Sequence, residues 1–347
     1  MAFYSEKPLL NKKDINGLRP EVLLSTGNRS TGKTTAWTRH FIEEFLEHKA
    51  KTAYLYRYAG ELKQISSKIF SEVVSLFFKG LDYADAPLVD NAGVEIFLDG
   101  QPAGYAIAIN AAEKIKKNSH LMNDVEAIYF DEFISESMQY VPGEFEKFAS
   151  IHTSLARGEG KHVRFLPTIM CGNVSSVINP YFVELDIATK IGPHTRWYQG
   201  DGFVLEQNHN KAAAKAMQQS AFGRAFKNSE YMQHASKNFY LNDKSNFISL
   251  PKRNGQYILT LKHQGKYYAV RNLEREGLWY ISGGADRGFP IRLAVLYEDC
   301  DPQFTMANYA IYKQIFYQRF AEGTIRFSDI LAQNAAYDMI RSTRKAG

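Results

Sequence analysis

A glycine-rich segment near the start of the chain has the spacing of a phosphate-binding loop. It fits the pattern GxxxxGK[ST] and reads Gly27-Asn28-Arg29-Ser30-Thr31-Gly32-Lys33-Thr34. The apolar run Val22–Thr26 precedes it and a helical pattern, Thr34–Glu47, follows it, which is the context that this motif requires. Backbone N–H groups of such a loop close around phosphates, and the start of the helix favours an anion. The segment therefore predicts a nucleotide site.

Individual side chains of this loop have predicted roles. Lys33 is expected to reach the β- and γ-phosphates of ATP, and the Thr34 hydroxyl is expected to bind Mg²⁺. Arg29, inside the loop, is a candidate to stabilise charge in a transition state. The residues expected to bind the nucleotide are Gly27, Asn28, Arg29, Ser30, Thr31, Gly32, Lys33, Thr34, Thr35 and Arg57.

A pair of acids follows a second apolar run. Asp131 and Glu132 come directly after Ala127–Phe130, which resembles a strand that delivers an acid to the carboxyl edge of a sheet. Asp131 is expected to hold the magnesium ion, and Glu132 to orient and deprotonate the attacking water. An acidic pair alone is often just a solvated strand end, but the loop upstream favours the functional interpretation. The second acid indicates hydrolysis as well as binding.

The next predicted strand, Phe165–Cys171, ends in Gly172-Asn173. Because ligands of open α/β sheets bind along the carboxyl edge, Asn173 is expected to lie beside the loop and the acidic pair. It is a candidate sensor of the γ-phosphate or of the attacking water. The alternative is an asparagine that only forms a turn.

Four arginines are candidates to stabilise transition-state charge, although solvation is the default for an arginine side chain. Arg157 lies in an exposed, glycine-containing stretch that is suited to reach a neighbouring subunit as an arginine finger. Arg164 lies close by in the sequence and is an alternative for that role. The other two are Arg29, in the loop, and Arg57, after the second predicted strand.

The order of the elements predicts two α/β domains. Strand and helix patterns alternate through the first half, which indicates a mainly parallel sheet, and Asp99-Gly100 predicts a β-hairpin. A polar stretch with a helical pattern follows, and then an antiparallel meander and two helical patterns. The predicted divisions are an ATPase domain over residues 1–205, a linker over 206–237 and a smaller domain over 238–347.

Composition excludes several classes of protein. The chain has 347 residues and is 45% hydrophobic, which suits a soluble chain of about two domains. Cys171 and Cys300 are far apart in the sequence, so neither a disulfide framework nor a zinc site is expected. No apolar run approaches the roughly 20 residues that cross a bilayer. We expect a cytoplasmic protein, and the net charge of +5 permits a nucleic-acid partner without requiring one.

The motifs together resemble the DNA-packaging ATPase, or encapsidation protein, of phi-29-type podophages, a relative of terminase large subunits. The resemblance covers most of residues 20 to 185 and weakens afterwards. The residues that carry it are Gly27–Thr34, Tyr56-Arg57-Tyr58 with Glu61-Leu62, Phe97–Gly100 with Ala103-Gly104, Phe130–Ile134, Asn173 with Asn179–Phe182, and, further on, Gly323–Phe327.

This resemblance implies a fold, partners and a location. The fold is an ASCE-type P-loop NTPase followed by a small RNase H-like α/β domain. The partners are double-stranded DNA, the phage portal or connector, further copies of the chain in a ring of five, and, as an open question, a packaging RNA. The protein would act in the host cytoplasm, bound transiently to the procapsid. An arginine in the region of Arg157 would act in trans, but the chain is longer than the family pattern between Arg157 and Asn173, which leaves Arg164 as an alternative.

DNA binding and nuclease chemistry would depend on residues outside the nucleotide site. Lys114, Lys116 and Lys117 form the best basic cluster for DNA, with a solvated helix face as the alternative. The first strand expected in the second domain, Tyr257–His263, carries no acid, whereas a two-metal nuclease needs convergent carboxylates. We therefore expect a vestigial domain that contacts DNA or the portal. A kinase or helicase, or a nucleotide-switched scaffold without catalysis, remains an alternative function.

Overall fold

The computed structural model describes residues 4–28, 31–88, 93–135, 140–157, 163–173, 179–188, 190–191, 195–227, 255–306 and 309–341. The chain divides into two compact units, of which the first contains residues 1–175 and 194–238 and the second contains residues 176–193 and 239–347. The predicted boundary at residue 205 falls inside strand β9, Phe203–Asn208. The predicted linker therefore begins within the sheet of the first unit.

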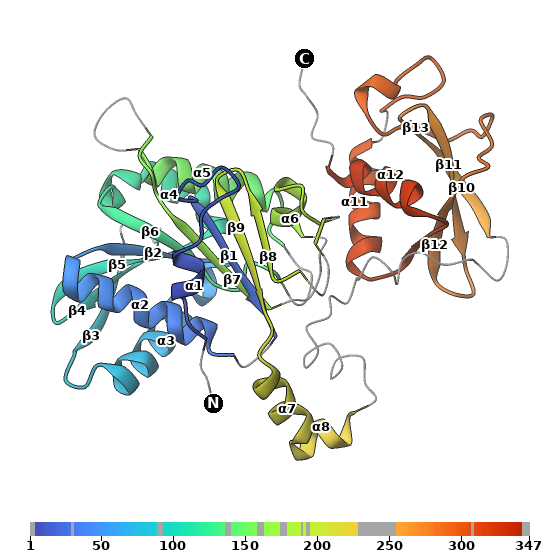
Figure 1. Ribbon diagram of the computed structural model, residues 1–347. Coiled ribbons are helices and arrows are strands. Elements are labelled where there is room, and N and C mark those ends of the chain that lie inside the picture. The colour runs from blue at the N-terminus through green and yellow to red at the C-terminus, as the bar shows by residue number, and fades with distance from the viewer. Residues whose placement is uncertain are drawn as a thin grey trace. The chain divides into compact units, whose positions relative to one another are not determined.

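The first unit is built on a nine-stranded sheet with the order β3-β4-β5-β2-β6-β7-β1-β9-β8 (Figure 1). The neighbours from β5 to β9 pair in parallel, and the pairs β3/β4, β4/β5 and β8/β9 are antiparallel. The mainly parallel α/β sheet is thus confirmed. Its strands are β1 Val22–Gly27, β2 Lys51–Tyr56, β3 Tyr83–Pro87, β4 Gly93–Leu98, β5 Gln101–Ala108, β6 Val125–Phe130, β7 Thr168–Asn173, β8 Trp197–Gly200 and β9 Phe203–Asn208.

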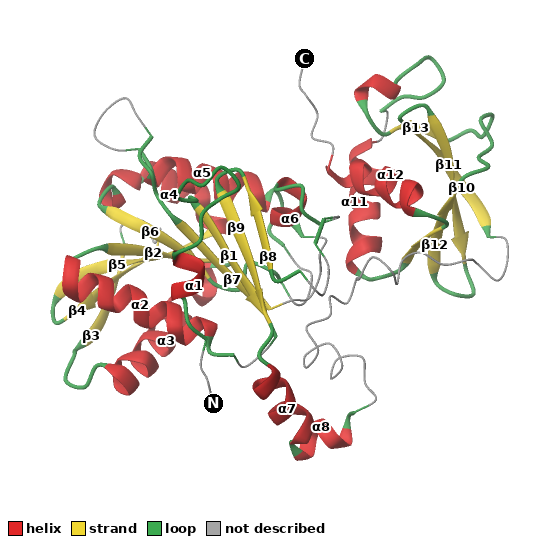
Figure 2. Ribbon diagram, viewed as in Figure 1, coloured by secondary structure: helices red, strands yellow, loops and turns green. Residues whose placement is uncertain are grey.

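Helices cover both faces of this sheet (Figure 2). Successive side chains of a strand point to opposite faces, and the end of β6 shows what lies on each one. The Tyr129 ring lies 5.5 Å from the Phe41 ring of α2, whereas the Phe130 ring lies 6.3 Å from the Phe148 ring of α5. The helices of this unit are α1 Lys7–Leu10, α2 Lys33–His48, α3 Leu62–Phe77, α4 Ala112–Lys117, α5 Glu144–Leu155, α7 Lys211–Gln219 and α8 Ala221–Ala225.

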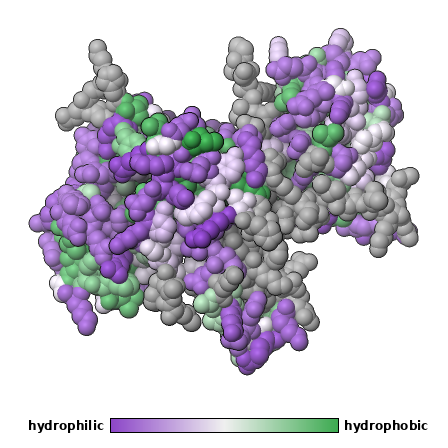
Figure 3. Space-filling model, viewed as in Figure 1, coloured by the Kyte–Doolittle hydropathy of each residue, from purple (hydrophilic) through white to green (hydrophobic). Residues whose placement is uncertain are grey.

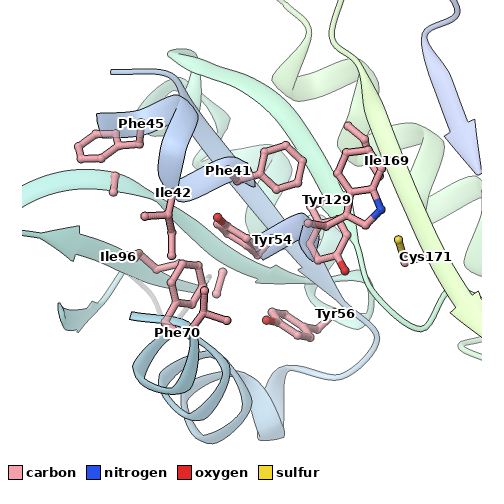
Figure 4. Close-up of a cluster of buried hydrophobic side chains, with 14 of the residues drawn as sticks. Phe41, Ile42, Phe45, Tyr54, Tyr56, Phe70, Ile96, Tyr129, Ile169 and Cys171 are labelled. Atoms are coloured by element: carbon pink, nitrogen blue, oxygen red, sulfur yellow. The ribbon is translucent and has the colours of Figure 1, made fainter. Parts of the chain in front are cut away.

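The core between the sheet and helices α2 and α3 is rich in aromatic rings (Figure 4). Tyr54 of β2 lies at its centre, with ring centroids 4.7 Å from Phe70 and 6.1 Å from both Phe41 and Tyr129. Burial of side chains of this size supplies a large hydrophobic stabilisation, and tilted or edge-on ring pairs add to it. The core fixes α2 against the central strands, and α2 begins at Lys33.

The predicted hairpin is confirmed, and it belongs to the main sheet. Asp99 and Gly100 have φ angles of 47° and 71°, as a tight turn between antiparallel strands requires. Strand β5 then pairs in parallel with β2, which joins the hairpin to the central strands. The edge strands β3 and β8 were not predicted. Strand β3 contains Asp85 and Pro87, residue types that are depleted in strands except at edges.

The second unit contains a five-stranded sheet with the order β13-β10-β11-β12-β14. The predicted meander is confirmed, because β10, β11 and β12 pair antiparallel in sequence order. Rings of α11 and of the sheet pack together, as Trp279 does with Phe316 at 5.6 Å. The elements are α6 Pro180–Glu184, β10 Gln256–His263, β11 Lys266–Leu273, β12 Leu278–Ser282, β13 Arg292–Ala294, α11 Tyr309–Ala321, β14 Ile325–Phe327 and α12 Ile330–Arg341.

The surface of the described residues is mainly hydrophilic on the face shown in Figure 3, with a few hydrophobic areas. Within the described ranges, no helix combines the length and the apolar character that a membrane crossing needs.

Candidate nucleotide-binding site

The phosphate-binding loop begins where β1 ends, between two parallel neighbours. Gly27 pairs with Asn173 of β7 on one side and with Asn208 of β9 on the other. A Cβ atom at Gly27 would lie 2.3 Å from the carbonyl oxygen of Asn208, which is far closer than atoms can pack. Only glycine fits this position, and its backbone can also approach a phosphate closely. Arg29 and Ser30 lie outside the described residues.

Lys33 is the first residue of α2 and follows Gly32, which has a φ of 82°. The lysine is 7% exposed, and its Nζ donates to the Asn28 carbonyl oxygen at 3.2 Å and to the Thr31 Oγ1 at 3.1 Å. Burial lowers the pKa of Lys33, while nearby Asp131 among other groups raises it. A buried cation held only by neutral oxygens is poised to bind an anion, because a phosphate would restore the solvation that burial removes.

Asp131 follows the last residue of β6 and lies beside the loop. Its carboxylate accepts a hydrogen bond from the Thr34 side chain and another from the Glu132 N–H at 3.1 Å. Burial raises the pKa of Asp131 to about 6. A carboxylate and a hydroxyl in contact fit Mg²⁺, which keeps several waters and takes few protein ligands when phosphates supply the rest. No group of three or more His, Cys, Asp or Glu side chains suited to a metal occurs among the residues that the structure describes.

Glu132 has an unusual backbone conformation. Its φ is 54°, a left-handed value that is uncommon for residues other than glycine and that clusters at functional sites. The segment is held on its far side by the Phe133 N–H, which donates to the Cys171 carbonyl oxygen of β7 at 3.0 Å. This fixed turn presents the exposed Glu132 side chain at the same sheet edge as Lys33.

Arg57 holds the opposite side of that turn. Its guanidinium donates to the carbonyl oxygens of Glu132 and Phe133 at 3.1 and 2.9 Å. It also forms an ion pair with the Glu144 carboxylate of α5, with an Nε to Oε2 distance of 2.9 Å, and the Glu144 side chain is fully buried. These contacts give Arg57 a clear structural role in fixing the acidic turn. Its predicted contact with the nucleotide stays a prediction.

Two further predicted residues lie near the loop. Asn173, at the end of β7, is half-buried and is in register with Gly27. Thr35 lies in the first turn of α2 and is also half-buried. Their positions are compatible with their predicted roles as sensor and as nucleotide contact, which stay predictions.

Arg157 and Arg164 lie at the opposite, amino edge of the same sheet. Arg164 donates to the carbonyl oxygens of Asn123 at 3.2 Å, of Leu155 at 3.1 Å and of Val125, the first residue of β6. Arg157 is exposed and forms a β-bridge with Val163. Strand β6, Val125–Phe130, separates this edge from Asp131 by about 20 Å at roughly 3.3 Å per residue. An arginine side chain cannot span that distance, so neither arginine reaches the nucleotide site of the same chain.

The predicted basic cluster lies on the short helix α4. Lys114, Lys116 and Lys117 are exposed, while Ala112 and Ile115 of the same helix are buried. Lys116 forms an ion pair with Glu113 at 3.3 Å. The cluster is therefore accessible to a partner, and its contact with DNA stays a prediction.

Sequence reasoning missed a polar network beneath the loop. Glu206 of β9 is 2% exposed and accepts a hydrogen bond from the Tyr4 hydroxyl at 3.1 Å, and Ser25 donates to the same hydroxyl oxygen at 2.9 Å. The backbone N–H of Tyr4 donates to the Thr31 carbonyl oxygen at 3.1 Å. The available signal was an acid at the end of the apolar run Phe203–Leu205, a pattern that was assigned in part to the linker.

Two acids of the second unit, Asp299 and Asp301, have local partners. Asp299 accepts from the backbone N–H groups of Gln264 and Gly265 at 2.9 and 3.1 Å. Asp301 forms an ion pair with Lys262 at 2.7 Å. These contacts support a structural role for both carboxylates.

Solved structures of other proteins share this fold. The fold and the loop define a nucleotide-binding protein of the P-loop α/β class. Its arrangement resembles two solved structures, the Phi-28 gp11 DNA packaging motor, with a TM-score of 0.58 and 16% identity, and the bacteriophage Phi-29 genome packaging motor assembly, with 0.55 and 23%. These alignments cover 99% and 98% of this chain, and 99% of each matched chain.

The chain belongs to the podovirus DNA encapsidation protein (Gp16) family, whose profile matches residues 2–345. It is 25% identical to the DNA packaging protein of Bacillus phage B103 over 331 residues, which is 92% of this chain and 96% of that protein. It is also 25% identical to the DNA packaging protein of Bacillus phage phi29, over 92% of both chains. The predicted family is thus confirmed, and the match extends well beyond residues 20 to 185.

Proposed function

We propose that the protein is an ATPase that moves double-stranded DNA into a phage procapsid. The observation that carries the proposal is the convergence of Lys33, Thr34, Asp131 and Glu132 at one sheet edge, in a chain of the DNA encapsidation family. The relatives named above are DNA packaging proteins, and ATP hydrolysis is the reaction that these four side chains suit.

Each side chain has a distinct part in the proposed reaction. Lys33 binds the β- and γ-phosphates, exchanging its contacts with Asn28 and Thr31 for charged oxygens. Asp131 and Thr34 hold Mg²⁺, which when bound neutralises charge on the phosphates. Glu132 takes the proton of the attacking water, and its fixed backbone turn limits the directions in which its carboxylate can point.

Arg157 belongs to a neighbour's site in this proposal. Because it lies at the amino edge, it can stabilise transition-state charge only across an interface between subunits. Arg164 is anchored to three carbonyl oxygens, which favours Arg157 over Arg164 as the finger. A ring, proposed to contain five subunits, satisfies this requirement at every site.

DNA and the capsid are the proposed partners of that ring. The exposed lysines Lys114, Lys116 and Lys117 are the proposed contacts to phosphates of the DNA backbone. The portal or connector of the procapsid in the host cytoplasm is the proposed docking partner, and a packaging RNA is a further one. We assign the second unit to contacts with DNA or the portal rather than to DNA cleavage.

The deciding experiment measures ATP turnover with and without double-stranded DNA, using Lys33→Ala as the matched control. We expect DNA to stimulate turnover by the wild-type protein, and Lys33→Ala to weaken nucleotide binding and to abolish turnover. Wild-type ATP affinity in Lys33→Ala would refute the nucleotide site. Stimulation by a small molecule but not by DNA would indicate a kinase, and binding without turnover would indicate a scaffold.

A further inference from the structure

The second residue of the phosphate-binding loop directs its side chain away from the loop. Asn28 is 3% exposed, and its Nδ2 donates to the Asn210 carbonyl oxygen at 3.2 Å. Its Oδ1 accepts a hydrogen bond from the Asn210 N–H at 2.9 Å. Both ends of one side-chain amide thus pair with the backbone of one residue, as two adjacent strands pair in a sheet.

Asn210 is also the residue that starts helix α7. Its Oδ1 accepts a hydrogen bond from the Ala213 N–H at 3.0 Å, which is an N-cap, and its carbonyl oxygen accepts the first helical bond, from Ala214 at 3.0 Å. Figure 1 shows that α7 follows directly after β9. Asn28 therefore contacts the N-cap residue of α7.

The backbone next to this contact is tightly packed. Gly27 leaves no space for a Cβ against Asn208, and Thr26 donates through its hydroxyl to the Glu206 carbonyl oxygen at 3.2 Å. The side chain of Asn28 extends the pairing of β1 with β9 by a further step. Because interiors packed this closely transmit strain, a shift of the loop at Asn28 would be felt at Asn210.

The same asparagine also contacts the residue that would bind phosphate. Lys33 Nζ donates to the carbonyl oxygen of Asn28, so the backbone of Asn28 touches the cation and its side chain touches the helix. When a phosphate binds the Lys33 ammonium group, it competes with the Asn28 carbonyl oxygen for the same donor. The charged phosphate oxygen forms the stronger hydrogen bond.

We propose that Asn28 is a positioning residue that couples occupancy of the phosphate site to helix α7. The inference rests on the proposed function for the identity of the ligand as a nucleotide. Engagement of Lys33 by phosphate shifts the backbone at Asn28, and the paired amide passes the shift to Asn210 and the start of α7. Helices α7 and α8 lead in sequence toward the second unit. Occupancy of the phosphate site therefore affects the chain that follows the sheet.

The coupling requires that residue 28 carry a hydrogen-bond donor and an acceptor, both at the distance from its own backbone that lets them pair with Asn210. Alanine provides neither. Glutamine provides both but extends one methylene too far, so that its amide cannot meet the Asn210 N–H and carbonyl groups in the same geometry. These two variants separate the loss of the amide from the loss of its position.

The experiment follows hydrogen exchange of the α7 amides in the full-length chain, with and without a non-hydrolysable ATP analogue and Mg²⁺. In the wild type, we expect the analogue to change the protection of α7. In nucleotide-free Asn28→Ala, the α7 amides should exchange about tenfold faster, as the loss of two hydrogen bonds implies. With bound analogue they should no longer respond. Asn28→Gln, which serves if Asn28→Ala fails to fold, should respond less than the wild type.

Asn210→Ala is the matched control, because it removes the cap to Ala213 but keeps the backbone groups that pair with Asn28. Its α7 amides should exchange faster and yet still respond to the analogue. If Asn28 acted only by stabilising α7, the loosened α7 of Asn210→Ala should lose the response as well. An unchanged response in Asn28→Ala with analogue bound would overturn the coupling. Bound analogue without any response of wild-type α7 would overturn it too, whereas failure of the wild type to bind the analogue would overturn the proposed function as well.

Discussion

The two edges of the large sheet treat charged side chains in opposite ways. At the carboxyl edge, Lys33 is buried and Asp131 is partly buried, their hydrogen bonds come from or go to neutral groups, and desolvation shifts the pKa of each toward its uncharged form. At the amino edge, Arg164 is bound to three backbone carbonyl oxygens, and Glu21 accepts a hydrogen bond from the Leu166 N–H at 2.8 Å. The charged groups of the carboxyl edge are thus placed to bind a ligand, whereas those of the amino edge stabilise the fold.

At each edge, one arginine departs from this pattern. Arg57 lies at the carboxyl edge but is bound like a structural residue, to Glu144 and two carbonyl oxygens. Arg157 lies at the amino edge but is exposed. These two arginines indicate where the distinction between ligand-binding and structural charges can be tested.

The largest effect is expected for Arg157→Ala. If this arginine completes a neighbour's site, its loss should lower turnover in the assembled ring by about 10³- to 10⁵-fold while ATP binding to the monomer stays normal. Rings that mix Arg157→Ala with Glu132→Gln subunits should regain activity, since an intact Glu132 can then face an intact Arg157. Arg164→Ala is the control. No recovery in any mixture would reject action across the interface.

Arg57→Ala should mainly lower the free energy of unfolding. The change leaves the Glu144 carboxylate buried without its cation, and breaking such a pair costs about 3 to 5 kcal/mol. Arg57→Lys keeps the charge but cannot serve the carboxylate and both carbonyl oxygens at once, so we expect only partial rescue. Urea unfolding measures the effect. Wild-type stability with lost ATP binding would instead make Arg57 a nucleotide contact.

Glu132→Gln should retain binding of ATP and Mg²⁺ while turnover falls on the order of 10²-fold or more, because a general base is lost and its shape is kept. Single-turnover kinetics with separately measured nucleotide affinity distinguish the two steps. Asp301→Asn, in the second unit, is the matched acid-to-amide control and should leave turnover unchanged. Near wild-type turnover in Glu132→Gln would assign the base to another residue.

Asp131→Asn should stabilise the protein when nucleotide and metal are absent. The pKa of Asp131 is about 6 in the folded chain against an ordinary 3.8, so the folded state binds the extra proton between these values and loses stability as the pH rises through them. At pH 7.5 the variant should gain about 2 to 3 kcal/mol. Near pH 4 the gain should vanish. Thermal melts at both pH values check this, and a gain of equal size at both would exclude ionisation as the cause.

The smallest effect is expected at the exposed cluster between the two edges. Replacing Lys114, Lys116 and Lys117 with alanine should reduce the slope of log DNA affinity against log salt by up to about one unit per lost phosphate contact. Affinity should fall equally for unrelated DNA sequences, since a motor grips phosphates rather than base edges. An unchanged slope would place the DNA contact on a different surface.

Local sequence patterns were sufficient to predict which motifs meet at the carboxyl edge. The loop around Lys33 and the acids after β6 are short motifs, and parallel strands bring their carboxyl ends together. The ion pair of Arg57 with Glu144 joins residues 87 positions apart, and neither the residue types nor their spacing predicts it. Strand β9 was missed for a similar reason, because its place beside β1 depends on pairing between distant segments. The position of Arg157 at the far edge became clear only once the direction of α5 was known.

The place of β1 in the sheet also has a consequence for biosynthesis. Strand β1 is translated before both of its neighbours, β7 at Thr168–Asn173 and β9 at Phe203–Asn208. At a synthesis rate of roughly 5 to 20 residues per second, the nascent strand waits about 10 to 40 s for its second partner to be made. The backbone groups of Val22–Gly27 that pair with β9 in the finished sheet lack that partner during that time. The phosphate-binding loop is thus translated well before the second strand that flanks it, and chaperones have an interval in which to bind it.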